Sequence, residues 1–276
     1  LASGHGDAGH PHTPFARRPL NVTRPPYGTA AQRAGARDDG PMHPAVRRRA
    51  ALLTLLLGFG VCATFAALAA DVYDDVTEAD GIAVLDQPVL QAVLRLRTPG
   101  LTRTVSWFTD LGSTLPMTVL VVVAAVSLSL MSRSVQPLAV TMVTAAGSVS
   151  LTVISKAVVG RARPPFIDAV PPFESSFSFP SGHSLNSMAL VGVLAYLAAL
   201  QVQHWWWRAL VVAAAGTFTV AMGLSRVYLG HHWFTDVMGA WAIALAWLAV
   251  VITAHQLHLH RRGAGRRPAG QRLDAV

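Results

Sequence analysis

The sequence predicts an all-α integral membrane protein, a bundle of six transmembrane helices. Two observations carry this prediction. First, 52% of the 276 residues are hydrophobic and only 13% are charged, whereas roughly 25% of the residues of a soluble domain are charged. Second, the apolar residues gather in separate blocks of about 20 residues, which is the length that a helix needs to cross the hydrocarbon core of a bilayer.

The first apolar block covers residues 50–70 and directly follows three arginines. A cleaved signal peptide is the alternative interpretation, because the sequence ALAAD at residues 67–71 resembles a cleavage site. The apolar core of a signal peptide is about 7–15 residues long, however, and this block is longer. We therefore expect a retained transmembrane helix.

Five further apolar blocks follow, each long enough to span or nearly span a bilayer. They cover residues 113–131, 137–159, 184–202, 209–224 and 237–254. The predicted membrane domain therefore runs from residue 50 to residue 254. With six spans, both ends of the chain lie on the same side of the membrane.

The distribution of charge predicts the orientation. Residues 1–49 carry a net charge of +5 and residues 255–276 a net charge of +4, whereas residues 71–113 carry −4. Arginine and lysine gather on the cytoplasmic side of membrane proteins, so we expect both tails in the cytoplasm of a plasma-membrane protein. The loops 157–183 and 225–236 then face the extracytoplasmic side. Nucleic-acid binding is an alternative reading of the basic ends, but arginines that flank membrane spans are commoner, so no nucleic-acid partner is expected.

Outside the spans, the sequence predicts little regular structure. Residues 1–49 are rich in Pro, Gly, Ala, Arg and His and have no apolar periodicity, which predicts a disordered N-terminal tail. Met42 is an alternative start of the chain, and residues 255–276 form a second basic tail. Residues 83–97 have helical spacing, and we expect either a helix along the membrane interface or a plain loop helix.

Three polar clusters lie at the outward ends of the predicted spans. They are Lys156 and Arg163 in KAVVGRARPP, Ser181, Gly182 and His183 in FPSGHS, and Arg226, His232 and Asp236 in SRVYLGHHWFTDV. Each has an ordinary explanation by itself: a snorkelling cation, a turn, or a helix cap. Three such clusters at one membrane face are harder to explain in this way, because ionisable groups at a membrane boundary usually serve a function.

The chemistry of the clusters predicts an anion site. Lys156, Arg163 and Arg226 would neutralise a phosphoryl group, since an arginine fork engages two oxygens at once. Ser181 offers a hydroxyl group. Gly182 offers a backbone N–H without a side chain in the way, just before an apolar helix whose N-terminus favours anions.

The two adjacent histidines differ in their partners. His232 and Asp236 are four residues apart at the start of a predicted helix, so we expect a hydrogen bond between them. A carboxylate that holds one ring nitrogen leaves the other free to attack. The matching partner of His231 is Thr235, which orients a ring less well. His232 is therefore the predicted nucleophile.

Together, KAVVGRARP, PSGH and SRVYLGHHWFTD resemble the three signature motifs of the type 2 phosphatidic acid phosphatase (PAP2) superfamily, which includes bacterial acid phosphatases and vanadium haloperoxidases. The family pattern is Lys, six residues, Arg-Pro; then Pro-Ser-Gly-His; then Ser-Arg, five residues, His, three residues, Asp. Every specified position matches over about 80 residues. The six-helix layout extends the resemblance to residues 50–254.

The resemblance implies a membrane lipid phosphate phosphatase and a role for each matching residue. The phosphate oxygens would be bound by Lys156, Arg163, Ser181, Gly182 and Arg226. His232 would attack phosphorus to give a phosphohistidine, Asp236 would orient it, and His183 would protonate the leaving group and then activate water. The cationic cradle could replace a metal ion. The chain has no evident carboxylate cluster and one cysteine, so we expect no metal and no other cofactor.

Two other functions and several substrates stay open at this point. Haloperoxidase chemistry uses a similar anion site, but the known enzymes of that kind are soluble. A transporter or non-enzymatic lipid binder usually places its site near the bilayer midplane, whereas these clusters lie at span ends. The expected partners are membrane lipids and a lipid phosphate substrate, with phosphatidate, phosphatidylglycerol phosphate and undecaprenyl diphosphate as candidates.

Overall fold

The computed structural model describes residues 44–265, which are built from helices and connecting loops without a β-strand. The helices are α2 (Pro44–Glu78), α3 (Asp86–Arg95), α4 (Pro99–Asp110), α5 (Thr114–Ser132), α6 (Gln136–Val159), α7 (Gly182–Gln201), α8 (Trp205–Tyr228) and α9 (Phe234–Gly265). Two short 3-10 helices are η1 (Gly81–Leu85) and η2 (Phe166–Asp168). Met42 and the tail residues 1–43 and 266–276 lie outside the described residues.

Six of these helices are long and apolar enough to cross a membrane, which confirms the predicted number of spans. They are α2, α5, α6, α7, α8 and α9.

The outer helices are longer than the apolar blocks predict. α2 begins at Pro44, and α9 continues to Gly265, so the expected domain boundaries at residues 50 and 254 fall inside helices. A helix does not end where the hydrocarbon core ends, because basic side chains snorkel toward water while the backbone stays helical. It ends at residues that break or start helices: Pro44 is suited to a first turn, and no glycine or proline interrupts α9 between residue 254 and Gly263.

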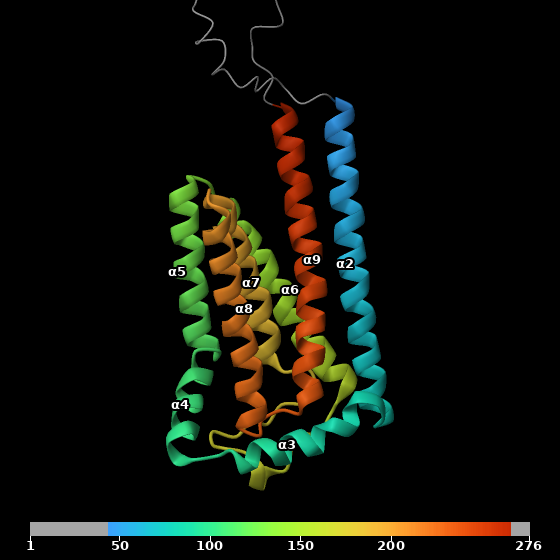
Figure 1. Ribbon diagram of the computed structural model, residues 1–276, viewed down its shortest axis with the longest axis vertical. Helices are drawn as coiled ribbons and strands as arrows, with labels where there is room; N and C mark the ends of the chain where they lie inside the picture. Colours follow the sequence, from blue (N-terminus) through green and yellow to red (C-terminus); the bar gives the residue numbers. More distant parts are fainter. Residues whose placement is uncertain (1–43, 266–276) are drawn as a thin grey trace, which may run out of the picture. The chain divides into compact units, whose positions relative to one another are not determined.

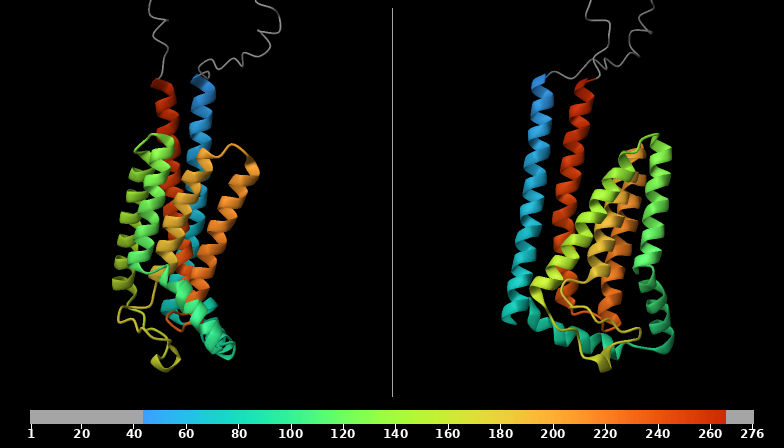
Figure 2. Two further views of the ribbon diagram at one scale, coloured as in Figure 1. Left: turned by 90° about the vertical axis from the view of Figure 1, so that its left-hand side faces the viewer. Right: turned by 180° about the vertical axis from the view of Figure 1, so that it is seen from behind.

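Helices α2 and α9 lie side by side along much of their length (Figures 1 and 2). Gly58 of α2 lies so close to Thr253 of α9 that a Cβ atom on Gly58 would be 1.9 Å from the Thr253 hydroxyl oxygen. Further along, the hydroxyl of Thr54 lies 3.3 Å from Nε2 of His260. Small residues let membrane helices approach closely. The close approach allows the dispersion contacts that stabilise helix pairs in a bilayer, where no hydrophobic effect drives them together.

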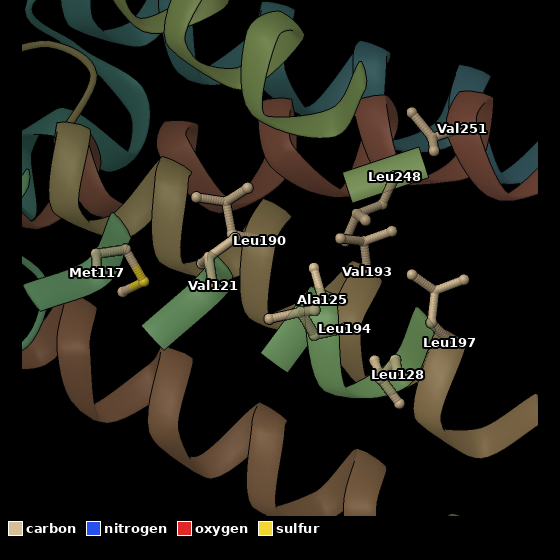
Figure 3. Close-up of a cluster of buried hydrophobic side chains, with 10 residues drawn as sticks. All are labelled: Met117, Val121, Ala125, Leu128, Leu190, Val193, Leu194, Leu197, Leu248 and Val251. Carbon is tan, nitrogen blue, oxygen red and sulfur yellow. The ribbon is translucent and has the colours of Figure 1, made fainter. Parts of the chain in front are cut away.

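Helix α7 is the centre of the bundle and packs against α5, α6, α8 and α9. Figure 3 shows the apolar cluster that α7 forms with α5 and α9, whose members are Met117, Val121, Ala125, Leu128, Leu190, Val193, Leu194, Leu197, Leu248 and Val251. Within this cluster, the residues of α5 and α7 follow the spacing of three, four and seven that one face of a helix requires. The cluster therefore packs the second half of α7 against α5 and α9.

The acidic segment after α2 is more ordered than the sequence predicts. Within residues 83–97, α3 lies across one end of the bundle (Figure 1) and packs against α8 and α9, with Asp86 and Leu90 buried. Helix α4 was not predicted. Its signal is local, because Pro99 occupies the first turn and the hydroxyl of Thr98 accepts a hydrogen bond from the backbone N–H of Leu101 at 3.3 Å.

Candidate active site

The three predicted motifs meet at one end of the bundle. Helices α6 and α8 end where α7 and α9 begin, and Figure 1 shows these ends beside α3. Lys156 lies in the last turn of α6 and Arg226 in the last turn of α8. Asp236 lies in the first turn of α9, and Ser181 is the N-cap of α7. The fold thus brings together ionisable residues from four helices and the loop 160–181.

His232 and Asp236 form a buried pair, although not by the route that the spacing predicts. Nδ1 of His232 lies 3.3 Å from Oδ2 of Asp236, and their side chains are 1% and 0% exposed. His232 precedes α9, which begins at Phe234, so the two residues do not share a helix face. Instead, the Asp236 carboxylate reaches back over the turn and also accepts a hydrogen bond from the backbone N–H of Trp233 at 2.9 Å. A carboxylate at this position satisfies N–H groups that the helix leaves unpaired.

The surroundings of His232 keep its ring neutral. Burial lowers the pKa of His232 to about 4; the hydrogen bond and charge of Asp236 oppose this shift, and Arg163 and Arg226 add to it. In the neutral ring, Nδ1–H donates to Asp236 and Nε2 keeps its lone pair. Nη1 of Arg163 lies 3.2 Å from that Nε2. The free nitrogen of His232 therefore faces the guanidinium group that was predicted to bind substrate.

His231 has a different environment. Its Nε2 lies 2.6 Å from the carbonyl oxygen of Val170, and burial lowers the pKa of the ring. Its backbone carbonyl accepts a hydrogen bond from Nη1 of Arg163 at 2.6 Å. The side chain of His231 thus holds the loop, and its main chain holds Arg163.

Glu174, which the sequence analysis did not identify, lies between the predicted cations. Its Oε2 is 2.6 Å from Nη2 of Arg163, and its Oε1 forms a very short ion pair with Nη2 of Arg226. Burial alone would raise the pKa of Glu174, but Arg226, His232 and Arg163 more than offset that effect and lower it to about 2. An ionised carboxylate therefore bridges the two arginines.

Lys156 is engaged by the same loop. Its Nζ donates to the hydroxyl of Ser176 at 3.3 Å and to the carbonyl of Phe177 at a shorter distance. Arg163 also binds the carbonyl of Ser176 through Nε at 2.7 Å. The loop around Glu174 thus supplies acceptors for all three predicted cations.

Two cavities meet at Glu174 and Ser176. One, of about 290 Å³, lies among α5, α6 and α7, and its lining includes Lys156, His183 and Asn186. The other, of about 450 Å³, is bordered largely by the loop 160–181. The first offers apolar walls for a lipid beside polar groups, which is typical of a ligand pocket.

The PSGH motif contributes less of its side-chain chemistry than expected. The hydroxyl of Ser181 is buried and accepts a hydrogen bond from the hydroxyl of Ser184 at 2.9 Å, as part of the N-cap of α7. Gly182 begins α7, so its N–H has no partner within the helix. His183 lines the 290 Å³ cavity and packs against Gly112, where a Cβ atom would lie 2.8 Å from the ring carbon Cδ2.

Three more polar residues support the site without having been predicted. Ser178 donates a very short hydrogen bond to Oδ2 of Asp236. Arg161 pairs with Asp236 and with Asp86. Arg161 stands inside the first motif, so its charge was a usable signal, whereas Asp86 lies 75 positions away and no local pattern marks it. Among residues 44–265, no cluster of three His, Cys, Asp or Glu side chains could hold a metal ion.

Comparison with known proteins places this architecture in a family. The family model of the PAP2 superfamily matches residues 137–259. Phosphatidylglycerophosphatase B of Bacillus subtilis is 32% identical over 164 residues, which cover 58% of this chain and 78% of that protein. An undecaprenyl-diphosphatase of Sulfolobus acidocaldarius is 31% identical over 100 residues, which cover 35% of this chain and 44% of the relative.

A solved structure is also similar. It is the crystal structure of a transmembrane PAP2-type phosphatidylglycerolphosphate phosphatase from Bacillus subtilis, with a TM-score of 0.62 and 28% sequence identity. The match covers 72% of this chain and 96% of that one. The resemblance of the three motifs and the six-helix layout is thereby confirmed, and the chain belongs to the PAP2 superfamily as a multi-pass membrane phosphatase.

Proposed function

We propose that this protein hydrolyses the phosphate ester or diphosphate of a membrane lipid through a phosphohistidine on His232, without a metal ion. The observation that carries the proposal is the position of Glu174. Its carboxylate bridges Arg163 and Arg226 next to the unprotonated Nε2 of His232. A phosphoryl group presents the same negative oxygens at a similar spacing, so the site is already complementary to an oxyanion.

In the first half of the reaction, the substrate phosphate replaces the Glu174 carboxylate between the arginines. Nε2 of His232 attacks phosphorus, and the bond between phosphorus and the leaving oxygen breaks. Asp236 accepts the Nδ1–H hydrogen bond and stabilises the positive charge that develops on the ring. His183 gives a proton to the leaving oxygen, which stays with the lipid in the cavity among α5, α6 and α7.

In the second half, His183 takes a proton from water, whose oxygen attacks the phosphorus of the phosphohistidine. The bond to Nε2 breaks and inorganic phosphate leaves. Phosphoryl transfer depends mainly on positioning and on charge stabilisation. Lys156, Arg163 and Arg226, with the hydroxyl of Ser181 and the N–H of Gly182, are the groups that would supply this stabilisation.

The substrate is a lipid whose phosphate lies close to its tails. Relatives named for phosphatidylglycerol phosphate and for undecaprenyl diphosphate support these two classes, and phosphatidate offers the same group. The arginine distribution supports cytoplasmic tails and an extracytoplasmic site in the plasma membrane. Reporter domains fused to the two tails test this orientation, and an outward tail would refute it.

The deciding experiment is a phosphate-release assay on the purified protein with EDTA present and a panel of lipid mono- and diphosphates. We expect release from at least one lipid and a phosphorylated protein after rapid quenching with alkaline detergent. The label should be stable to alkali and lost in acid, as a phosphohistidine is. Complete dependence on added Mg²⁺, or no release from any lipid phosphate, contradicts the proposal.

A further inference from the structure

Arg161 is held between two buried carboxylates at the edge of the site. Its Nη1 lies 2.7 Å from Oδ1 of Asp236, and its Nη2 lies 2.6 Å from Oδ2 of Asp86. The side chains of Asp86 and Asp236 are 6% and 0% exposed. Buried charges are costly unless each is paired, so this chain of three charges is a feature that calls for an explanation.

Asp86 binds the start of α9 as well as Arg161. Its Oδ1 accepts from the backbone N–H of Thr235 at 2.9 Å, and its Oδ2 accepts from the Thr235 hydroxyl at 2.6 Å. Nη1 of Arg161 donates to the same hydroxyl at 2.8 Å. Asp86 therefore caps the start of α9 through Thr235, the residue before Asp236.

Each oxygen of the Asp236 carboxylate has its own task. Oδ1 is bound by Arg161 at 2.7 Å. Oδ2 accepts from His232 Nδ1 at 3.3 Å and from the N–H of Trp233 at 2.9 Å. Arg161 on Oδ1, together with Ser178 and Trp233 on Oδ2, therefore fixes the carboxylate so that Oδ2 stays directed at His232.

We propose that Asp86 and Arg161 are positioning residues of the reaction, which fix the Asp236 carboxylate and set the charge that His232 experiences. They connect the start of α3 to the nucleophile, although neither is hydrogen-bonded to the predicted phosphate-binding cations (the cradle cations), which are Lys156, Arg163 and Arg226. The inference rests on the proposed role of His232. It adds two supporting residues: Asp86, which lies outside the three motifs, and Arg161, which lies inside the first motif at a position without an assigned role.

The two charges act on His232 in opposite directions. Arg161 offsets part of the negative charge of Asp236, and Asp86 offsets part of the positive charge of Arg161. The other charged and titratable groups facing the His232–Asp236 pair are Lys156, Arg163, Glu174, His183 and Arg226. None of these is altered when Asp86 or Arg161 is replaced.

The test is the pH dependence of kcat/KM in two variants of the purified full-length protein. In Arg161→Gln, the uncompensated Asp236 carboxylate stabilises the protonated His232 ring more strongly. The pKa of His232 rises, so the acid limb should move to higher pH by about one unit. In Asp86→Asn, the uncompensated Arg161 weakens Asp236, so the acid limb should move to lower pH. Ionisation of the substrate is common to all variants, so a difference between profiles reports the enzyme. Shifts in the same direction, or none, overturn the proposal.

The kinetic constants provide a second readout. Because the cradle cations are untouched, KM should change by less than about threefold, while kcat falls roughly 10- to 100-fold through misalignment. The double variant Asp86→Asn/Arg161→Gln loses no net charge, and its acid limb should return close to that of the wild type. Arg161→Lys keeps the charge but loses the fork, so kcat should fall while the limb stays in place. If Asp86→Asn and Arg161→Gln do not fold, Arg161→Lys decides the question: an unchanged kcat in Arg161→Lys overturns the proposal.

Two matched controls separate positioning of Asp236 from simple attachment of the segment between α2 and α4 to the bundle. Asp75→Asn removes a carboxylate that accepts from the N–H of Ile82 at 2.9 Å, and Arg97→Gln removes a side chain that binds the carbonyl of Tyr228. Neither should move the acid limb, and a shift in either control of the size seen in Arg161→Gln overturns the proposal. Turnover by His232→Ala at the wild-type rate would refute the proposed nucleophile itself. An inactive His232→Ala together with unshifted profiles would refute only the positioning role.

Discussion

Oε2 of Glu174 lies 2.6 Å from Nη2 of Arg163, so a guanidinium group predicted to hold the substrate already holds a carboxylate of the same chain. The other oxygen of Glu174 pairs with Arg226. These two arginines come from the loop after α6 and from the last turn of α8, and Glu174 joins them where the two cavities meet. Any oxyanion that enters the site has to displace this carboxylate.

Replacement of Glu174 by glutamine should therefore tighten the binding of inorganic phosphate. A neutral amide competes less well for two guanidinium groups, and a charge-assisted hydrogen bond is roughly twice as strong as a neutral one. We expect the inhibition constant of phosphate to fall by about tenfold. Competitive inhibition assays measure it, with Ser175→Ala, a change at the exposed neighbouring residue, as control. A weaker inhibition than in the wild type would mean that Glu174 holds the arginines in place for the anion.

The two adjacent histidines should respond differently to alanine. His232→Ala removes the nitrogen that faces Arg163, and turnover should fall by about a thousandfold or more. His231→Ala removes a side-chain bond to the carbonyl of Val170, which should cost about 1 kcal/mol of stability and at most a few-fold in kcat.

Phosphate labelling trapped by an alkaline detergent quench separates the two variants further. Labelled protein should form with His231→Ala and be absent with His232→Ala. Label in His232→Ala and none in His231→Ala would mean that His231, and not His232, is the nucleophile.

His183→Ala should affect monophosphates more than diphosphates. An alkoxide needs a proton in order to leave, whereas the leaving group of a lipid diphosphate is itself a phosphate and needs less help. We expect a loss in kcat of about 100-fold or more on a lipid monophosphate and a clearly smaller loss on a lipid diphosphate. Parallel assays with phosphatidate and undecaprenyl diphosphate measure the difference, and equal losses on both would exclude His183 as the proton donor.

Gly112 should be required for activity although it carries no functional group. A Cβ atom there would lie 2.6 Å from Sδ of Met222 and 2.8 Å from Cδ2 of His183. Gly112→Ala should therefore displace the His183 ring and lower kcat by about tenfold or more. Gly100→Ala is the matched control, because a Cβ at Gly100 meets nothing within 4 Å. If both variants keep wild-type turnover, the ring has room to move without loss of function.

Much of the architecture could be predicted because it depends on local properties of the chain. A block of about 20 apolar residues has to be helical in a bilayer, since every backbone polar group needs a partner within the segment. The spans α5, α6 and α7 therefore begin and end within two residues of their predicted positions. The same reasoning misplaced both ends of α2 and of α8 and the C-terminal end of α9 by four or more residues. There the helical backbone continues beyond the apolar block, and hydropathy gives no signal.

The site was predictable to the extent that its residues recur at fixed spacing. Lys156, Arg163, Arg226 and the His232–Asp236 pair stand in two of the three motifs, whose order and intervals could be read directly. The preference for His232 over His231 also needed only the position of Asp236. In the structure, however, a turn before α9 makes this pair, and not a shared helix face.

What the sequence by itself determined, then, is the number of spans, the family motifs and the pairing of His232 with Asp236, because helical hydrogen bonding and short intervals along the chain decide them. Only the tertiary structure placed Glu174 between Arg163 and Arg226, and Asp86 against Arg161, which lies 75 positions later. An acidic residue in a loop has many basic residues within reach of a flexible chain. Which of them it meets is decided by the packing of α3, α7, α8 and α9, and that packing leaves no periodic trace in the sequence.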